Sequence, residues 1–163
     1  MALKRWILFI VIFLISLTVV LSLLIYFQAK NPFKTASEDA ESYVMKHELL
    51  SDINDSYVYN SSDSFHTVIG TTDNGEEKAF FIPEKKTDEA IMEVNLKDGI
   101  TKEQAIELAM KEEKDSKILH AKLGVEEVGP VWEITFVDND NNLGYVYLLL
   151  FNDGDWWKRI SNL

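Results

Sequence analysis

The three histidines are the residues of this sequence best suited to acid–base or metal chemistry. They lie far apart along the chain, at His47, His66 and His120. Their spacing matches neither H-x-x-x-H nor the H-E-x-x-H motif, which places two zinc ligands on one face of a helix. We expect His47 in the apolar stripe of a helix and the other two on the outward faces of strands. The sequence therefore predicts no metal site built from histidine.

The sequence also lacks the common nucleophile motifs of hydrolases and acyltransferases. It contains no Cys, no G-x-S-x-G elbow and no S-x-x-K motif. Paired carboxylates such as Glu76-Glu77 and Glu112-Glu113 occur, but charged side chains of this kind are usually solvated. We therefore expect a protein that is not an enzyme, with no catalytic residue and no cofactor.

The acidic turn that begins at Asp138 is a candidate cation site. Acids and amides at its first, third and fifth positions, Asp138, Asp140 and Asn142, match the opening of an EF-hand loop. The match then fails, because Leu143 stands where that loop needs Gly and Leu149 where it needs Glu. Asp and Asn also favour tight turns by bonding their own backbone. The sequence favours a plain hairpin turn and leaves weak calcium binding open.

A pair of adjacent tryptophans, Trp156 and Trp157, is the most unusual surface feature of the sequence. Neighbouring side chains of a strand point to opposite faces, so one ring should pack inward and the other outward. An exposed Trp is an effective anchor for a partner protein. We interpret the pair as a candidate partner-binding site. The alternative is that both rings simply close one end of a small domain.

An uncharged apolar segment near the N-terminus indicates a membrane anchor. As a helix, the 22 residues 6–27 would span roughly 33 Å, which matches the hydrocarbon core of a bilayer. Trp6 at one end, and Tyr26 with Phe27 at the other, suit the two membrane interfaces. The segment is longer than the apolar region of a cleaved signal peptide. We therefore expect an uncleaved anchor that contacts the lipid bilayer.

The charge distribution sets the expected partners and location. The chain carries 16 basic and 27 acidic residues, for a net charge of -11. This balance argues against a nucleic-acid partner, which needs a basic face to meet phosphates. Lys4 and Arg5 precede the apolar segment, which favours a cytoplasmic N-terminus. The sequence predicts a single-pass protein of the cell membrane whose acidic C-terminal domain is extracytoplasmic.

Two amphipathic helices, each followed by strand signals, indicate an internal repeat. The first helix has an apolar stripe from Ala36 to Leu50, and the second begins at Thr101, with Gln104 completing a capping box. Residues of the two helices match at a fixed offset of 65, as Ala40 does with Ala105. The predicted strands are Ser56–Tyr59, Ser64–Thr71 and Lys78–Ile82 in the first repeat, Lys117–Leu123, Val131–Val137 and Gly144–Phe151 in the second, and a linking strand around Met92, Val94 and Leu96.

These elements define an α+β fold. We predict an N-terminal transmembrane helix followed by two repeats, each a helix packed on an antiparallel three- to four-stranded meander. The predicted parts are a cytoplasmic N-terminus at 1–5, a transmembrane anchor at 6–27, a short tether at 28–34, a first repeat at 35–98 and a second repeat at 99–163.

The second repeat resembles the PepSY domain. The resemblance is carried by the helix start Gly99–Ile106, by Val131–Ile134, by Tyr145–Tyr147 and by Asp153-Gly154. With an N-terminal anchor and two such units, the whole chain is similar to the TseB-like cell wall elongation regulators of Gram-positive bacteria. It departs from the PepSY pattern at Asp155–Ile160, which is unusually aromatic where these units have a short apolar strand.

The resemblance implies a non-catalytic, membrane-anchored binding module that regulates cell wall elongation. Its implied partner is a class B penicillin-binding protein, a transpeptidase of peptidoglycan synthesis. Two alternatives stay open. PepSY units also occur as protease modulators or inhibitors, and a sheet edge can accept a peptide by strand addition. The acidic surface could also serve an extracytoplasmic sensor of cations or small ligands.

Overall fold

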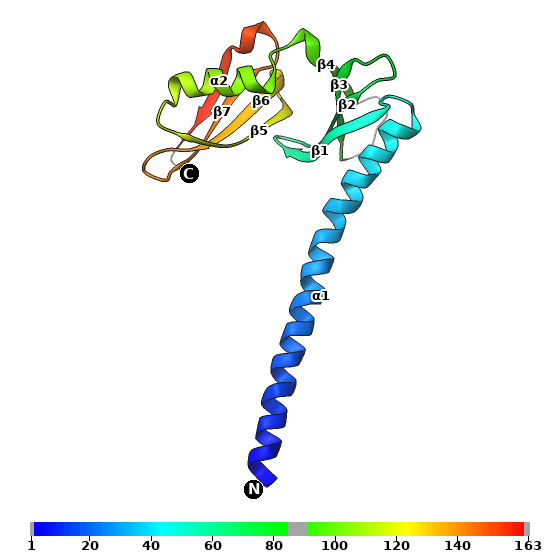
Figure 1. The fold of residues 1–163 in the computed structure, drawn as a ribbon, viewed down its shortest axis with the longest axis vertical. Coiled ribbons are helices and arrows are strands. Elements are labelled where there is room, and N and C mark those ends of the chain that lie inside the picture. The colour runs from blue at the N-terminus through cyan, green and yellow to red at the C-terminus, as the bar shows by residue number, and fades with distance from the viewer. Residues whose placement is uncertain (1, 85–90, 162–163) are drawn as a thin grey trace. The chain divides into compact units, whose positions relative to one another are not determined.

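The computed structural model divides the chain into two compact units, residues 1–36 and 37–163. It describes the backbone of residues 2–84 and 91–161, and the side chains of 4–27, 37–84, 91–151 and 153–161. The first unit is helical, and the second contains two antiparallel sheets of four strands each (Figure 1). The predicted α+β class with an N-terminal apolar helix is confirmed.

Helix α1 is the longest element and runs from Ala2–Lys46. Its segment Lys4–Phe27 is long and apolar enough to cross a membrane. The predicted tether at 28–34 is helical in the structure and continues α1. This segment contains Pro32, which lacks the N–H that a helix interior uses. One missing N–H removes a single bond to the preceding turn, and the structure continues the helix through that position.

The end of α1 explains why the predicted helix is too long. Glu48 has a left-handed φ of 54°, and the N–H groups of Glu48 and Leu49 donate to the carbonyls of Met45 and Val44. This bond pattern is the Schellman motif, which closes a helix and satisfies its last carbonyls. Glycine is the usual residue at the left-handed position, and its absence hid the helix end from the sequence analysis.

The first sheet follows this turn, with the strands β1 (Asp52–Asn60), β2 (Ser64–Thr71), β3 (Glu77–Pro83) and β4 (Met92–Asn95) in that spatial order. The predicted linking strand is therefore the fourth strand of this sheet, paired with β3. Ala40 and Val44 of α1 pack on Val68, Phe80 and Ile82 of the sheet. Side chains on one face of β2 and β3 thus bury the last turns of α1.

The second repeat has the same order of elements. The short helix η2 (Leu96–Asp98) leads into it. Its helix and four strands are α2 (Lys102–Glu112), β5 (Lys117–Glu126), β6 (Gly129–Val137), β7 (Leu143–Leu149) and β8 (Trp156–Ile160), with η3 (Asn152–Gly154) between the last two strands. The predicted capping box is present, because Thr101 Oγ1 accepts from the Gln104 N–H and the Gln104 side chain accepts from the Thr101 N–H. Helix α2 lies across one face of the β5–β8 sheet (Figure 1).

A β-bulge at the equivalent position of each sheet supports the internal repeat that the sequence predicts. The pairing of β1 with β2 shifts between Ile53 and Asp55, and that of β5 with β6 shifts between Ile118 and His120. These bulges lie 65 residues apart, the offset that the helices predicted. A bulge bends its strand and raises the local twist, so the two sheets curve at equivalent positions.

The two repeats share one hydrophobic core. Ala79, Phe81 and Val94 of the first sheet belong to the same buried cluster as Ala105 of α2 and Leu148 of β7. The first sheet is therefore covered on both faces, by α1 on one and by the second repeat on the other. Neither repeat buries its apolar surface alone.

Side chains of β1 and of Ser61, the residue after it, close the outer edge of β5. The Tyr57 hydroxyl donates to the Leu123 carbonyl at 3.2 Å and accepts from the Leu123 N–H at 2.8 Å. Ser61 Oγ donates to the Val125 carbonyl at 2.9 Å. An uncovered edge strand offers these backbone groups to other chains. Here hydroxyls from the first repeat satisfy them, so the junction between the repeats also protects the edge.

Candidate functional site: the inter-repeat groove

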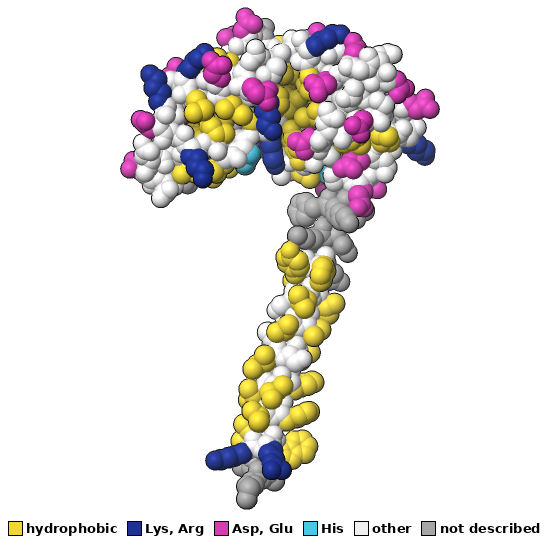
Figure 2. Space-filling view, in the orientation of Figure 1, with side chains coloured by type: hydrophobic (Ala, Val, Ile, Leu, Met, Phe, Trp, Pro, Cys, Tyr) yellow, Lys and Arg dark blue, Asp and Glu magenta, His cyan; other side chains and the backbone are white. Residues whose placement is uncertain are grey.

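A hollow in the second unit lies between the two repeats, and we call it the inter-repeat groove. Its volume is about 610 Å³, within the usual range of roughly 300–1,000 Å³ for ligand-binding pockets. Figure 2 shows hydrophobic side chains in a hollow of this unit, with acidic side chains around it. The groove is lined by residues of β1 and β2, the turn into β3, η2, the start of α2, and strands β5 and β6.

The floor of the groove is apolar and firmly held. Ile69, Leu96 and Ile100 are partly buried and pack against the shared core. The backbone of Ile100 is bonded at both ends, because its N–H donates to the Leu150 carbonyl at 2.9 Å and its carbonyl accepts from Trp132 Nε1 at 3.0 Å. The floor therefore offers apolar side chains, and this part of its backbone has no group left for strand addition.

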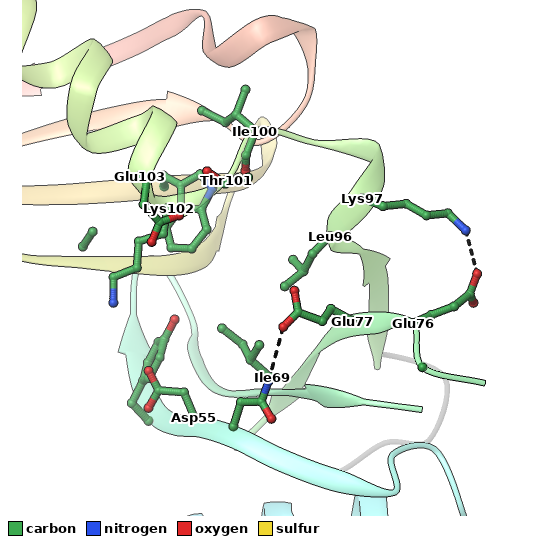
Figure 3. A pocket seen from close by; sticks show the side chains of 15 residues that line it. Asp55, Ile69, Glu76, Glu77, Leu96, Lys97, Ile100, Thr101, Lys102 and Glu103 are labelled. Atoms are coloured by element: carbon green, nitrogen blue, oxygen red, sulfur yellow. Dashed lines mark hydrogen bonds and ion pairs between the residues drawn. The ribbon is translucent and has the colours of Figure 1, made fainter. Parts of the chain in front are cut away.

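The rim of the groove carries charges of both signs, with acids in excess (Figure 3). Lys97 Nζ lies 2.6 Å from Glu76 Oε1, so these two charges neutralise each other. Glu77 accepts a long hydrogen bond of 3.4 Å from Asn54. The ion pair with Lys97 holds the pKa of Glu76 below its usual value. The remaining charged lining residues are Asp55, Glu77, Lys102 and Glu103, three acids against one base.

Tyr57 joins the groove to the junction between the repeats. Burial raises the pKa of its hydroxyl, and the nearby carboxylates of Asp55 and Glu133 raise it further, although the hydrogen bond to the Leu123 backbone opposes this. The hydroxyl is therefore neutral over the physiological range and keeps its proton for the Leu123 carbonyl. Lys122 lies over the Tyr57 ring, with its Nζ 5.3 Å from the ring centroid. These contacts fix the wall of the groove on the β1 side.

The predicted pair of tryptophans divides as its strand position requires. Trp156 is 39% exposed, and it lines a small hollow with Glu112, Glu113 and Arg159. Trp157 is half-buried and meets the Tyr147 ring edge-on, with centroids 5.9 Å apart. Arg159 holds the strand to α2, because its Nε lies 2.7 Å from Glu113 Oε1. The structure does not bring either tryptophan into the groove lining.

The predicted anchor residues lie on α1. Trp6, Tyr26 and Phe27 are 65%, 53% and 62% exposed. Tyr26 lies twenty residue positions after Trp6 along the helix, which corresponds to about 30 Å, the thickness of a hydrocarbon core. The two aromatic ends are thus spaced as interface residues of a membrane helix are.

The histidines lie in different surroundings from those predicted, with one exception. His47 is exposed, because α1 ends at Lys46, and its ring lies on Tyr43 with centroids 4.2 Å apart. His66 is buried rather than exposed, because it shares a face of β2 with Val68, which packs under α1. His120 is exposed as predicted, and its Nε2 lies 2.9 Å from Thr135 Oγ1. Burial and the nearby Lys122 and Lys102 lower the pKa of His120.

The acidic turn forms the predicted hairpin. Asp138 accepts from the N–H groups of Asp140 and Asn142 at 2.9 and 2.8 Å, and from the Asn142 side chain at 3.0 Å. These bonds lower the pKa of Asp138 and turn its oxygens toward the loop backbone. Over the described ranges 4–27, 37–84, 91–151 and 153–161, the structure has no group of three or more His, Asp or Glu side chains that could hold a metal ion.

The groove is the feature that the sequence analysis missed. Leu96 was predicted in the linking strand and Ile100 in the helix start of the second repeat, but β4 ends at Asn95 and Leu96 begins η2. Their common surface exists because the link Leu96–Ile100 lies between two sheets that share a core. The available signal was the pair of apolar residues just before the Thr101 cap. Nothing in the sequence indicated which residues of the first repeat lie opposite them.

The fold and the groove define a tandem-repeat α+β protein with an apolar groove between its repeats. Residues 39–83 match a family described as the cell wall elongation regulator TseB-like domain. The matched segment runs from the last turns of α1 to the end of β3. This match confirms the resemblance found in the sequence and supports a role in cell wall elongation.

One solved structure has a similar fold. The chain is similar to the YpmB protein from Bacillus subtilis, with a TM-score of 0.66 and 22% sequence identity. The match covers 76% of this chain and 95% of that chain. At this identity the likeness shows the fold alone. No curated protein sequence matches the chain.

Proposed function

We propose that this chain is a non-catalytic, single-pass membrane protein that regulates cell wall elongation by binding a class B penicillin-binding transpeptidase. The observation that carries the proposal is the TseB-like domain at residues 39–83, in a chain whose Lys4–Phe27 segment is apolar enough to cross a membrane. Lys4 and Arg5 precede that segment, which favours a cytoplasmic N-terminus and an extracytoplasmic C-terminal domain.

The short distance along the chain between the anchor and the domain supports a partner in the same membrane. Only 11 residues separate Phe27 from the start of the matched domain at Asp39. Even fully extended, they span at most about 40 Å. A partner that is itself anchored in the bilayer therefore lies within reach of the domain, at a high effective concentration.

The surface chemistry supports protein binding over catalysis. Trp156 is an exposed aromatic side chain beside the Glu113–Arg159 ion pair, a combination typical of partner contacts. We propose Trp156 as a partner contact, with Trp157 supporting it from within the strand. The acidic domain, whose 27 acids all follow the apolar segment, favours a basic surface on the partner.

Nascent peptidoglycan labelling in cells tests the proposed function. A strain lacking the gene is pulsed with a fluorescent D-amino acid, and incorporation along the side wall is compared with that of a complemented strain. We expect reduced side-wall incorporation without the chain, and recovery with the full chain or with a copy whose anchor comes from an unrelated protein. Normal side-wall incorporation in the deletion strain would contradict the proposal.

A further inference from the structure

The residues that line the inter-repeat groove favour a ligand that carries both an apolar group and a polar group. Its floor presents the partly buried side chains of Ile69, Leu96 and Ile100. The described backbone at Ile100 is already bonded to Leu150 and Trp132, so a ligand meets side chains here and adds no strand. Recognition in such a site needs an apolar group on the floor and a polar group at the rim.

The charges of the rim determine the sign of that polar group. The Glu76–Lys97 pair is internally neutral. The other charged residues of the rim are three acids and one base, namely Asp55, Glu77, Glu103 and Lys102. Lys102 forms no ion pair among the described residues. Two acids remain in excess once Lys102 is balanced. A cationic side chain entering the groove meets an attractive field, while an anionic one meets repulsion.

We infer that the inter-repeat groove binds a polypeptide segment of the membrane partner, with an aliphatic side chain on the Leu96–Ile100 floor and a Lys or Arg beside Asp55 and Glu103. This inference rests on the proposed function, because it takes the segment to belong to the transpeptidase. A volume of about 610 Å³ accommodates two or three side chains of such a segment. The affinity comes from burying the aliphatic group, and the selectivity comes from the acids.

Two neighbouring residues of α2 provide a matched pair of variants with opposite expected effects. Lys102 and Glu103 are both exposed, and both lie in the first turn of the helix. Lys102→Glu makes the rim more acidic and should strengthen binding, while Glu103→Lys should weaken it. An acid in the first turn also stabilises a helix and a base there destabilises it, so the helix dipole shifts stability in the same direction. The midpoint of thermal unfolding of both variants is therefore measured beside the yield, and a change in yield counts as binding only where that midpoint is unchanged. Asp140→Lys, in the exposed turn after β6, is the control with the same change of charge as Glu103→Lys.

The test uses the full chain in cells, with a photo-crosslinking amino acid in place of the groove residue Asn54 or of the exposed Asn139 in the turn after β6. We expect ultraviolet light to link the transpeptidase to position 54 and not to position 139. In the position-54 background, Glu103→Lys should lower the yield about fivefold to tenfold, the factor that about 1–1.4 kcal/mol produces. Lys102→Glu should raise the yield, and Asp140→Lys should leave it unchanged.

The possible failures separate the inference from the function on which it rests. If the transpeptidase is captured by formaldehyde but not from position 54, or if the charge variants leave the yield unchanged, the groove inference is overturned and the proposed function stands. If position 54 links to peptidoglycan stem peptides instead of a protein, the inference is likewise overturned. If no reagent captures the transpeptidase from any position, the proposed function fails and the inference fails with it.

Discussion

Glu133 shows how a single charge is held at the junction of the repeats. It lies across from Lys122 of β5 and from Tyr147 of β7 in the strand register. Burial raises its pKa above the ordinary value, although the hydrogen bond from Tyr147 and the charge of Lys122 oppose this rise. The native state therefore binds a proton at Glu133 more readily than the unfolded state does.

The sign of this shift predicts how stability depends on pH. A carboxyl with a raised native pKa stabilises the fold most when protonated, below its unfolded pKa near 4.5, and this contribution is lost as the pH rises through the raised native value. Glu133→Gln keeps an acceptor for Tyr147 without the charge. We expect it to raise the midpoint of thermal unfolding at neutral pH by roughly 1–3 °C.

The measurement is thermal unfolding of the detergent-solubilised chain between pH 4 and pH 8, followed by near-ultraviolet circular dichroism. The gain from Glu133→Gln should shrink as the pH falls toward 4. The control is Glu127→Gln, at an exposed position in the turn after β5. A gain that is equal at both ends of the pH range would show that burial of the charge is not its cause.

Alanine variants of the two tryptophans should separate an effect on partner binding from an effect on the stability of the fold. Trp156→Ala removes an exposed ring, so we expect the midpoint of unfolding to change little while capture of the partner falls about fivefold. Trp157→Ala removes a half-buried ring that packs on Tyr147, so we expect a loss of about 2 kcal/mol in the free energy of unfolding. Chemical denaturation and in-cell crosslinking of both variants check this. Equal effects of the two variants on capture, after correction for stability, would argue against Trp156 as the contact.

Residue-level prediction from the sequence was uneven, for physical reasons. The outward position of His120 and the turn at Asp138 follow from strand alternation and from Asx chemistry, which are local rules. His47 and His66 depend on where α1 stops and on which elements cover β2. The left-handed Glu48 and the double covering of the first sheet have no local signal.

At the scale of elements, the contact of β1 with β5 holds the repeats together. Gly124 of β5 lies directly under the ring of Tyr59, and a Cβ at this position would overlap that ring. The Tyr59 hydroxyl also donates to Glu126 at 2.9 Å, and burial raises its pKa, so the hydroxyl keeps its proton for this bond. The absence of a side chain at Gly124 thus permits the close approach of the two strands.

Gly124→Ala should therefore loosen the junction. We expect a loss of about 2 kcal/mol in the free energy of unfolding, typical of overpacking at a rigid contact. The double variant with Tyr59→Ala should recover part of this loss, because the clash is then gone. Urea unfolding of the single and double variants measures the coupling. If the loss from Gly124→Ala is the same with and without the Tyr59 ring, the proposed clash is wrong.

The elements themselves were largely readable from the sequence. The predicted strand Ser64–Thr71 has the observed limits, and the capping box at Thr101 marks the start of α2. Strand β4 was recognised by its alternation, but its pairing with β3 was not. Pairing depends on the partner strand and on the length of the connection. The helical backbone at 28–34 was not predicted, because Pro32 has no N–H to donate within a helix.

At the scale of the molecule, the sharing of one core by two repeats creates the groove. Each sheet alone would leave an apolar face in water, and their packing buries most of both faces. The part left open between them is the inter-repeat groove, with its apolar floor and acidic rim (Figure 3). The order of elements was predictable from the repeat, whereas the groove required knowing how the repeats pack.

The measurement that tests the central claim most directly is in-cell crosslinking of the tagged full chain, followed by mass spectrometry. A second copy carries a foreign transmembrane helix in place of residues 6–27. The account predicts that both copies recover a class B penicillin-binding transpeptidase, because recognition lies in the domain after α1. Recovery by the native copy alone would place the contact in the bilayer and contradict the domain-based account, and recovery of proteases or of no partner by either copy would contradict the proposed function.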